Sequence, residues 1–121
     1  MFRAAIPVLH VRSSAKAEEF YCRQLGFAVH SAYRFDEKKP DPAYIVLTRD
    51  GVWLHVSSFS GDGVAGQCVF LAVDDVDATY EELKRKGVKF DMEPTDQTWG
   101  NREVYLRDPD GNSIRFTMEN E

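Results

Sequence analysis

Side chains suited to binding a small molecule gather near the C-terminus, in the stretch QTWGNREVYLRDPDGNSIRF at 97–116. Trp99 offers a flat ring for stacking, and Arg115 offers five N–H donors with a fixed positive charge. Glu103 and Tyr105 alternate with apolar residues, so they share one face of the expected strand. The tight turn expected at DPDGN places Tyr105 opposite Arg115 on the next strand.

A second group of this kind lies in VWLHVSS, where Trp53 and His55 alternate with apolar residues. A two-residue turn at 50–51 brings Tyr44, on the preceding strand, onto the same face. The facing pairs expected from this turn are Thr48–Trp53, Val46–His55 and Tyr44–Ser57. In CVFLAV, Phe70 lies on the face opposite the apolar residues, together with Cys68.

Each of these side chains also has a purely structural interpretation. Trp53 and Tyr44 could be core residues, and Arg115 could be an exposed strand residue paired with Glu103 on the neighbouring strand. The same mixed face recurs on several strands, and a concave sheet of this composition is typical of a small-molecule cleft. The predicted ligand-binding residues are Tyr44, Trp53, His55, Phe70, Trp99, Glu103, Tyr105 and Arg115.

An internal repeat predicts the elements that position these residues. The strand end LHV, a helical pattern and a turn glycine all recur about 60 residues later as LAV, a second helical pattern and a second turn glycine. Each half therefore reads as a strand, a helix and three more strands. The expected fold is α+β, one domain over 1–121, with module one at 1–59, a Ser/Gly-rich linker at 60–66 and module two at 67–121.

Local signals mark both helices. Ser13 or Ser14 can cap the first helix, and Asp74 or Asp75 the second, by accepting hydrogen bonds from first-turn amides. A glycine ends each helical pattern, where a left-handed residue is favoured. The second helix is expected to bury one stripe, formed by Val76, Tyr80 and Leu83.

Composition excludes several classes of function. The chain has 121 residues and a net charge of −5, without the basic stripe that nucleic-acid binding requires. No apolar run reaches the length of a membrane span, and the N-terminus is too short in its apolar part for a secretory signal. Cys22 and Cys68 form no disulfide framework, so we expect reduced thiols and a cytoplasmic protein.

The segments AIPVL, FYCRQLGF and WGNREVYLRDPDGN resemble the glyoxalase, bleomycin-resistance and dioxygenase superfamily, also called vicinal oxygen chelate proteins. The resemblance covers nearly the whole chain and is closest to the bleomycin-resistance branch through Trp99-Gly100. It implies two βαβββ modules that form a concave mixed β-sheet cleft, exchanged between chains in a homodimer.

The resemblance also locates the positions where enzymes of the superfamily hold a divalent metal. Those positions fall on Ile6, His55, Cys68 and Arg115. Ile6 has no lone pair to give, and Arg115 is a positively charged donor without an acceptor. His55 and Cys68 alone are too few for a tight site, so we expect no metal, no cofactor and no catalytic residue.

The resulting functional hypothesis is metal-free sequestration of a small, partly aromatic molecule that can carry a cationic group, with bleomycin-type compounds as candidates. Asp91, Glu93 and Asp96 could attract that group, or could form a solvated acidic loop. One alternative is a metal-dependent enzyme of glyoxalase or dioxygenase type that uses His55 with Cys68 or His10. Another is a dimeric interaction module without a small-molecule role. Cys68 itself is expected to lie among apolar neighbours, with an inert thiol.

Overall fold

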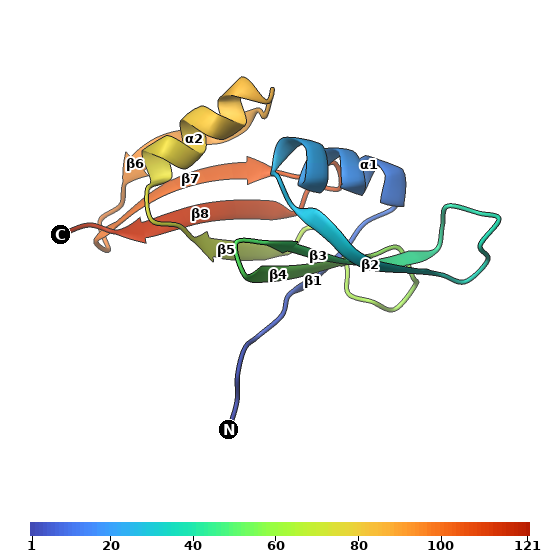
Figure 1. The fold of residues 1–121 in the computed structure, drawn as a ribbon. Helices are drawn as coiled ribbons and strands as arrows, with labels where there is room; N and C mark the ends of the chain where they lie inside the picture. The colour runs from blue at the N-terminus through green and yellow to red at the C-terminus, as the bar shows by residue number, and fades with distance from the viewer. The chain divides into compact units, whose positions relative to one another are not determined.

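The computed structural model describes residues 1–121 and is shown in Figure 1. The chain divides into two compact units, Met1–Ala65 and Gly66–Glu121. Each unit contains one four-stranded mixed sheet and follows the expected order of a strand, a helical segment and three strands. The predicted α+β fold with two βαβββ modules is confirmed. No helix has the length and apolar character needed to span a bilayer.

The sheet of unit 1 has the strand order β1-β4-β3-β2. β1 runs parallel to β4, and the other two pairings are antiparallel. The elements of unit 1 are β1 Val8–His10, α1 Ser14–Glu18, η1 Glu19–Gln24, β2 Ala28–Arg34, β3 Ala43–Arg49 and β4 Val52–Ser57.

The sheet of unit 2 repeats this arrangement with the order β5-β8-β7-β6. β5 runs parallel to β8, and the other strands pair antiparallel. In Figure 1, α2 lies along this sheet, and its backbone approaches β6, β7 and β8. The elements of unit 2 are β5 Cys68–Ala72, α2 Val76–Arg85, β6 Phe90–Asp96, β7 Asn101–Arg107 and β8 Ser113–Glu119.

The register of both central hairpins is the one that their turns predict. Asp50 and Gly51 both have positive φ, at 51° and 78°, as a two-residue hairpin turn that matches the strand twist requires. All three expected pairs across β3 and β4 are present. Tyr105 faces Arg115 across β7 and β8. The alternation of side chains is therefore fixed on both sheets.

One face of each sheet is a packed apolar layer. In unit 1, Ile45, Leu47, Leu54 and Val56 are at most 1% exposed. Burial of a side chain of this size stabilises the fold by about 1.5–3 kcal/mol. The corresponding layer in unit 2 consists of Val104, Leu106, Ile114 and Phe116. The opposite faces carry the predicted ligand-binding residues except Trp99, which lies in the turn between β6 and β7.

The first helical segment differs from the continuous α-helix that its sequence predicts. Ser13 caps α1 by accepting from the Lys16 amide at 3.2 Å, but the chain then widens into the π-helix η1. The Leu25 amide donates to the Phe20 carbonyl, five residues back. This wider turn aligns Phe20 with Leu25, and both are at most 6% exposed. Burial of large side chains five residues apart outweighs the α-helical preference.

The second helix follows its signals more closely. Asp75 caps α2 by accepting from the Ala78 amide at 3.0 Å. Val76 and Leu83 are fully buried as expected, whereas Tyr80 is only half-buried, with its ring 4.7 Å from that of Phe90.

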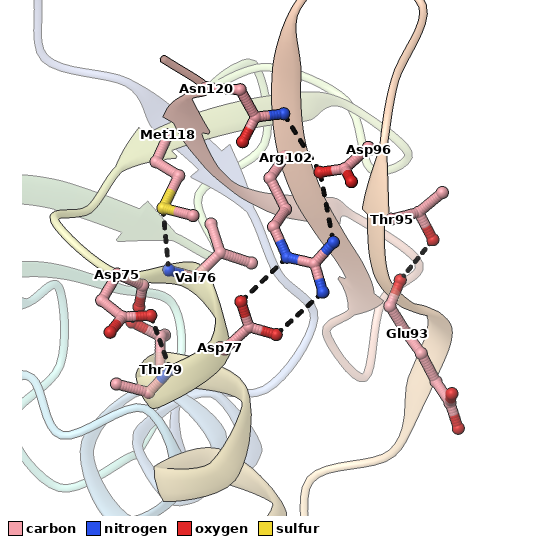
Figure 2. Close-up of polar contacts among 11 residues, drawn as sticks. Asp75, Val76, Asp77, Thr79, Glu93, Thr95, Asp96, Arg102, Met118 and Asn120 are labelled. Atoms are coloured by element: carbon pink, nitrogen blue, oxygen red, sulfur yellow. Dashed lines mark hydrogen bonds and ion pairs between the residues drawn. The ribbon is translucent and has the colours of Figure 1, made fainter.

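Arg102 ties β7 to its neighbours, as Figure 2 shows. Its Nε donates to Asp77 on α2 at 2.8 Å, and its Nη1 donates to Asp96 on β6 at 3.2 Å. Asn120 donates to the same Asp96 oxygen at 3.0 Å. These contacts link the first turn of α2 to two strands of the sheet.

A buried polar network fixes the turn between β7 and β8. The Asp108 carboxylate accepts from the backbone amides of Asp110 and Asn112 and from the Asn112 side chain, at 2.8–2.9 Å. Asn112 Oδ1 in turn accepts from the amides of Gly66 and Gln67, at 2.9 and 3.1 Å. The turn therefore also anchors the residues that lead into β5.

Candidate functional site

Arg115 is held in an aromatic frame on β8. Its guanidinium carbon lies 4.1 Å from the ring centroid of Tyr105 and 5.5 Å from that of Phe70. Nε donates to Ser113 Oγ at 3.2 Å. This arrangement follows from the register, because Phe70 on β5 and Tyr105 on β7 both flank Arg115 directly. We call this side of the sheet, defined by Phe70, Glu103, Tyr105 and Arg115, the unit 2 face.

Glu103 organises the polar groups of the unit 2 face. Its carboxylate is only 1% exposed and accepts from the Tyr105 hydroxyl at 2.6 Å and from Thr117 Oγ1 at 3.1 Å. It also accepts from the Trp99 indole Nε1 at 3.3 Å. Burial raises the pKa of Glu103, but the hydrogen bonds, led by that from Tyr105, outweigh burial and hold the pKa below its usual value. Glu103 is therefore a buried anion at neutral pH.

The alternative pairing of Arg115 with Glu103 is wrong. Glu103 directly faces Thr117, and its oxygens are taken by neutral donors. No carboxylate lies within ion-pairing distance of Arg115, whose contacts are the two rings and Ser113. The Tyr105 side chain contacts both charged groups instead. Its hydroxyl donates to the Glu103 carboxylate, and its ring lies against the Arg115 guanidinium.

Trp99 lies in the turn between β6 and β7 and is 61% exposed. Its indole N–H is bonded to Glu103, so the orientation of the ring is tied to the unit 2 face. Most of the ring surface remains open to solvent. The side chain can therefore offer a flat surface for stacking without first leaving a packed position.

We call the side of the unit 1 sheet that carries Tyr44, Trp53 and His55 the unit 1 face. Tyr44 and His55 form a short hydrogen bond there. The Tyr44 hydroxyl lies 2.6 Å from His55 Nδ1, and the two rings meet edge to face. Burial lowers the pKa of His55. Burial and, to a lesser extent, the negative charge of Asp62 raise the pKa of Tyr44. A neutral His55 that accepts this bond at Nδ1 carries its proton on Nε2.

Trp53 lies on the same side of unit 1 as Tyr44 and His55. It is 39% exposed, so it is not a core residue. Its ring lies 4.9 Å from that of His30 on β2. Tyr44 is half-buried. The core interpretation is therefore wrong for Trp53, whereas Tyr44 is partly buried and hydrogen-bonded to His55.

Two other expectations for unit 2 are corrected. The acidic residues of 91–96 belong to β6 rather than to a loop, and Asp91 and Asp96 are ion-paired with Arg107 and Arg102. They are thus engaged within the sheet, and only Glu93 projects an uncommitted carboxylate. Cys68 is exposed at the start of an edge strand, not enclosed by apolar neighbours.

The side chains at the metal-equivalent positions do not fit a metal site. Ile6 precedes β1 and offers no donor atom, and Arg115 places a cation in the aromatic frame. His55 and Cys68 are the remaining two, and two donors are too few for a tight metal site. No three His, Cys, Asp or Glu side chains are arranged so that they could hold a metal ion. That the purified protein carries no metal stays a prediction.

An open depression of about 510 Å³ lies elsewhere in unit 1. His10 on β1 forms one wall, and the Gly-rich segment that ends the unit forms the rest. None of the eight predicted ligand-binding residues lines it. Its lining residues are His10, Ser58, Ser60, Gly61, Gly63, Val64 and Ala65.

Sequence reasoning missed three members of these faces. Thr117 and Ser113 contact Glu103 and Arg115, and both follow from the alternation along β8 that identified Arg115. His30 reaches Trp53 at a bulge in β2, between Val29 and Ser31. Nothing in the sequence marks the position of that bulge, so His30 could not have been assigned in advance.

Comparison with known proteins supports the family suggested by the fold. Residues 4–116 match the model of the Glyoxalase/Bleomycin resistance protein/Dioxygenase superfamily. The chain is 40% identical over 117 residues to the uncharacterized protein YraH of Bacillus subtilis (strain 168), covering 89% of this chain and 91% of YraH. It is 28% identical over 138 aligned positions to a bleomycin resistance protein of Geobacillus stearothermophilus, covering 95% and 96% of the two chains.

A solved structure gives the same result. The structure of a bleomycin-binding protein complexed with bleomycin aligns with a TM-score of 0.75 and 25% identity, covering 99% of this chain and 100% of that one. The structural alignment and the family match both extend over nearly the whole length of the chain. This chain belongs to the Glyoxalase/Bleomycin resistance protein/Dioxygenase superfamily.

Proposed function

We propose that this protein binds a small, partly aromatic molecule without a metal, and protects by sequestration rather than by chemistry. Family membership supports binding of a small molecule, because the superfamily includes a bleomycin-binding protein with the same fold. The residues at the metal-equivalent positions support a metal-free mode. No nucleophile or general base is required, since occupancy alone removes the ligand from solution.

The observation that carries this proposal is the exposed, oriented ring of Trp99. An indole that is 61% exposed but bonded to a buried carboxylate is preorganised for stacking. On the same face, Tyr105 and Phe70 provide further aromatic surface around the charged group of Arg115. This combination suits a planar ring with polar substituents.

A bleomycin-type compound is the first candidate ligand, in line with the bleomycin resistance proteins among the relatives. Its planar rings would stack on Trp99, and its cationic tail would be favoured by the net charge of −5. Such binding would confer antibiotic resistance. We place it in a homodimer in the cytoplasm, where both free cysteines would stay reduced.

The alternative of a metal-dependent enzyme has less support. It would need His55 together with Cys68 or His10, which supply only two donors, and no group of three or more His, Cys, Asp or Glu side chains could complete the site. The Tyr44–His55 bond gives His55 a different role, as a hydrogen-bonded polar group on the unit 1 face.

The test is titration of the protein with bleomycin, followed by calorimetry and by tryptophan fluorescence. Trp99→Ala should weaken binding roughly two- to tenfold, the equivalent of a stacking contribution of about 0.5–1.5 kcal/mol. Phe2→Ala is the control, because Phe2 is also an exposed aromatic residue and lies outside the predicted set. Equal affinity of the Trp99 variant and the wild type would remove the stacking surface from the account.

A further inference from the structure

We propose that the unit 2 face recognises an oxyanion, of the carboxylate class, carried by a planar ring, and that Arg115 is the residue that selects it. This inference rests on the proposed function and deepens it by naming a chemical group of the ligand. It concerns a different part of the ligand from any cationic group.

The three arginines on the strands of unit 2 differ in whether they have a carboxylate partner. Arg102 is bonded to Asp77 and Asp96, and Arg107 is bonded to Asp91. Arg115 alone has no carboxylate partner. In a protein with 20 acidic and 15 basic side chains, an arginine on a strand without an acidic partner stands out. Its pairing capacity is available to a ligand.

The Arg115 guanidinium is held so that two of its nitrogens stay open to a ligand. Nε is occupied by Ser113 Oγ, and the face of the group lies 4.1 Å from the Tyr105 centroid. The contacts leave the paired Nη1 and Nη2 donors uncommitted. These two nitrogens form the fork that binds both oxygens of a carboxylate in one plane. A guanidinium stacked on a ring and held at Nε is preorganised for that contact.

The neighbouring negative charge, on Glu103, does not compete with a ligand for Arg115. Glu103 is buried, and its oxygens accept from Tyr105, Trp99 and Thr117. Burial and the Glu103 hydrogen bond raise the pKa of Tyr105, which keeps the phenol protonated as a donor. The carboxylate that could compete for Arg115 is thus already satisfied. The charge that this part of the face presents is positive.

The ring that carries the oxyanion has surfaces to contact nearby. Phe70 is 50% exposed and lies beside the guanidinium, and Trp99 is joined to the same network through Glu103. A ligand with a carboxylate on an aromatic ring would place the acid on Arg115 and the ring against these side chains. Neutral or cationic head groups on the same ring would lose the charge-assisted contact.

The test compares three probes that share one ring: 2-naphthoate, 2-naphthamide and 2-naphthylmethylammonium. Calorimetric titration of the wild type should show 2-naphthoate binding at least about tenfold more tightly than either of the others, because hydrogen bonds to charged groups are the strong ones. Arg115→Gln should abolish this preference. Arg115→Lys keeps the positive charge but lacks the two paired N–H donors, so it should retain part of the preference for 2-naphthoate.

Arg107→Gln is the matched control, since it removes one positive charge from the same side of the sheet. It should leave the preference for 2-naphthoate intact, and thermal melts of all variants check that they fold. Equal binding of the three probes, absence of any probe binding, or an equal loss in the Arg107 variant would each overturn the inference.

Bleomycin is titrated in parallel. If bleomycin binds while 2-naphthoate has no advantage, only the inference fails, and if neither binds, the proposed function fails too.

Discussion

Glu103 holds a negative charge in a position nearly closed to solvent, without a cation paired to it. Three neutral donors, the Tyr105 hydroxyl, the Trp99 indole and the Thr117 hydroxyl, share that charge, and the Asn101 side chain adds a fourth hydrogen bond. The same bonds hold Trp99, the exposed ring, and Tyr105, whose ring lies beside the Arg115 guanidinium. One buried carboxylate therefore supports both the stacking surface and the frame of the guanidinium.

Glu103→Gln should lower the free energy of unfolding at pH 7 by about 1–3 kcal/mol, because an amide cannot accept from all three donors. Burial opposes ionisation of Glu103, but the hydrogen bonds prevail and its pKa in the folded protein lies below the ordinary 4.5. The stabilisation from the charge is therefore complete above pH 4.5 and is lost as the pH falls through the folded pKa.

Urea unfolding at pH 7, 5 and 3 measures this effect, with Glu93→Gln as the control because Glu93 is exposed on the same unit. The gap between the wild type and the Glu103 variant should be full at pH 7 and should narrow towards pH 3. A gap of constant size over this range would contradict an ionised, hydrogen-bonded Glu103.

At the residue scale, the sequence predicted positions better than partners. The turn at DPDGN fixed Tyr105 opposite Arg115, and the same register places Glu103 opposite Thr117. Glu103 and Arg115 are therefore diagonal neighbours, a separation that long side chains can still bridge, so the register alone did not exclude the ion pair. The hydrogen bonds of Tyr44 and Trp99 also depend on side-chain rotamers, which strand alternation does not determine.

At the scale of elements, the turn between β7 and β8 positions three parts of unit 2 at once. Asn112 is fully buried and joins Asp108 to the amides of Gly66 and Gln67. The parallel strand β5 has no short turn to β8, so this side chain supplies the connection that a hairpin would otherwise provide. Phe70 on β5 reaches Arg115 on β8 through that pairing.

Asn112→Ala should lower the free energy of unfolding by about 1–3 kcal/mol, because the buried Asp108 carboxylate and two backbone amides lose their partner. Asn120→Ala serves as the matched control. Asn120 is exposed and bonds only near the end of the sheet, so its loss should change stability by less than about 0.5 kcal/mol. Thermal and urea unfolding of both variants would decide, and equal stability of the two would contradict the role given to the turn.

The internal repeat predicted the order and type of nearly every element, because each module carries its own caps, turn glycines and alternating strands. The π-helix η1 and the bulge in β2 escaped prediction. Both insert one residue into a regular hydrogen-bond pattern to satisfy packing at particular side chains. The periodic pattern of a sequence reports the regular element, not the tertiary contact that distorts it.

At the scale of the whole molecule, two units each leave apolar side chains exposed. Val29, Tyr33, Phe35 and Trp53 in unit 1 are between 39% and 75% exposed, as is Phe70 in unit 2. Contiguous apolar groups mark an interaction surface, and we predict that the unit 1 residues form one. The homodimer expected from the sequence would cover that surface.

Light scattering at micromolar concentration should therefore give a mass of twice the 13.8 kDa chain. The dimer should persist on dilution, because a twofold interface built from these side chains buries apolar area. A species of one chain mass across the whole dilution series would rule out the dimer and any site that depends on a second copy.

The central claim is binding without a metal, and the most direct measurement is calorimetric titration of metal-stripped protein with metal-free bleomycin in the presence of EDTA. Saturable binding should occur in the wild type without metal, should persist in His55→Ala, and should be weaker in Trp99→Ala. Binding that appears only after zinc, nickel, manganese or iron(II) is restored, and that His55→Ala abolishes, would contradict binding without a metal.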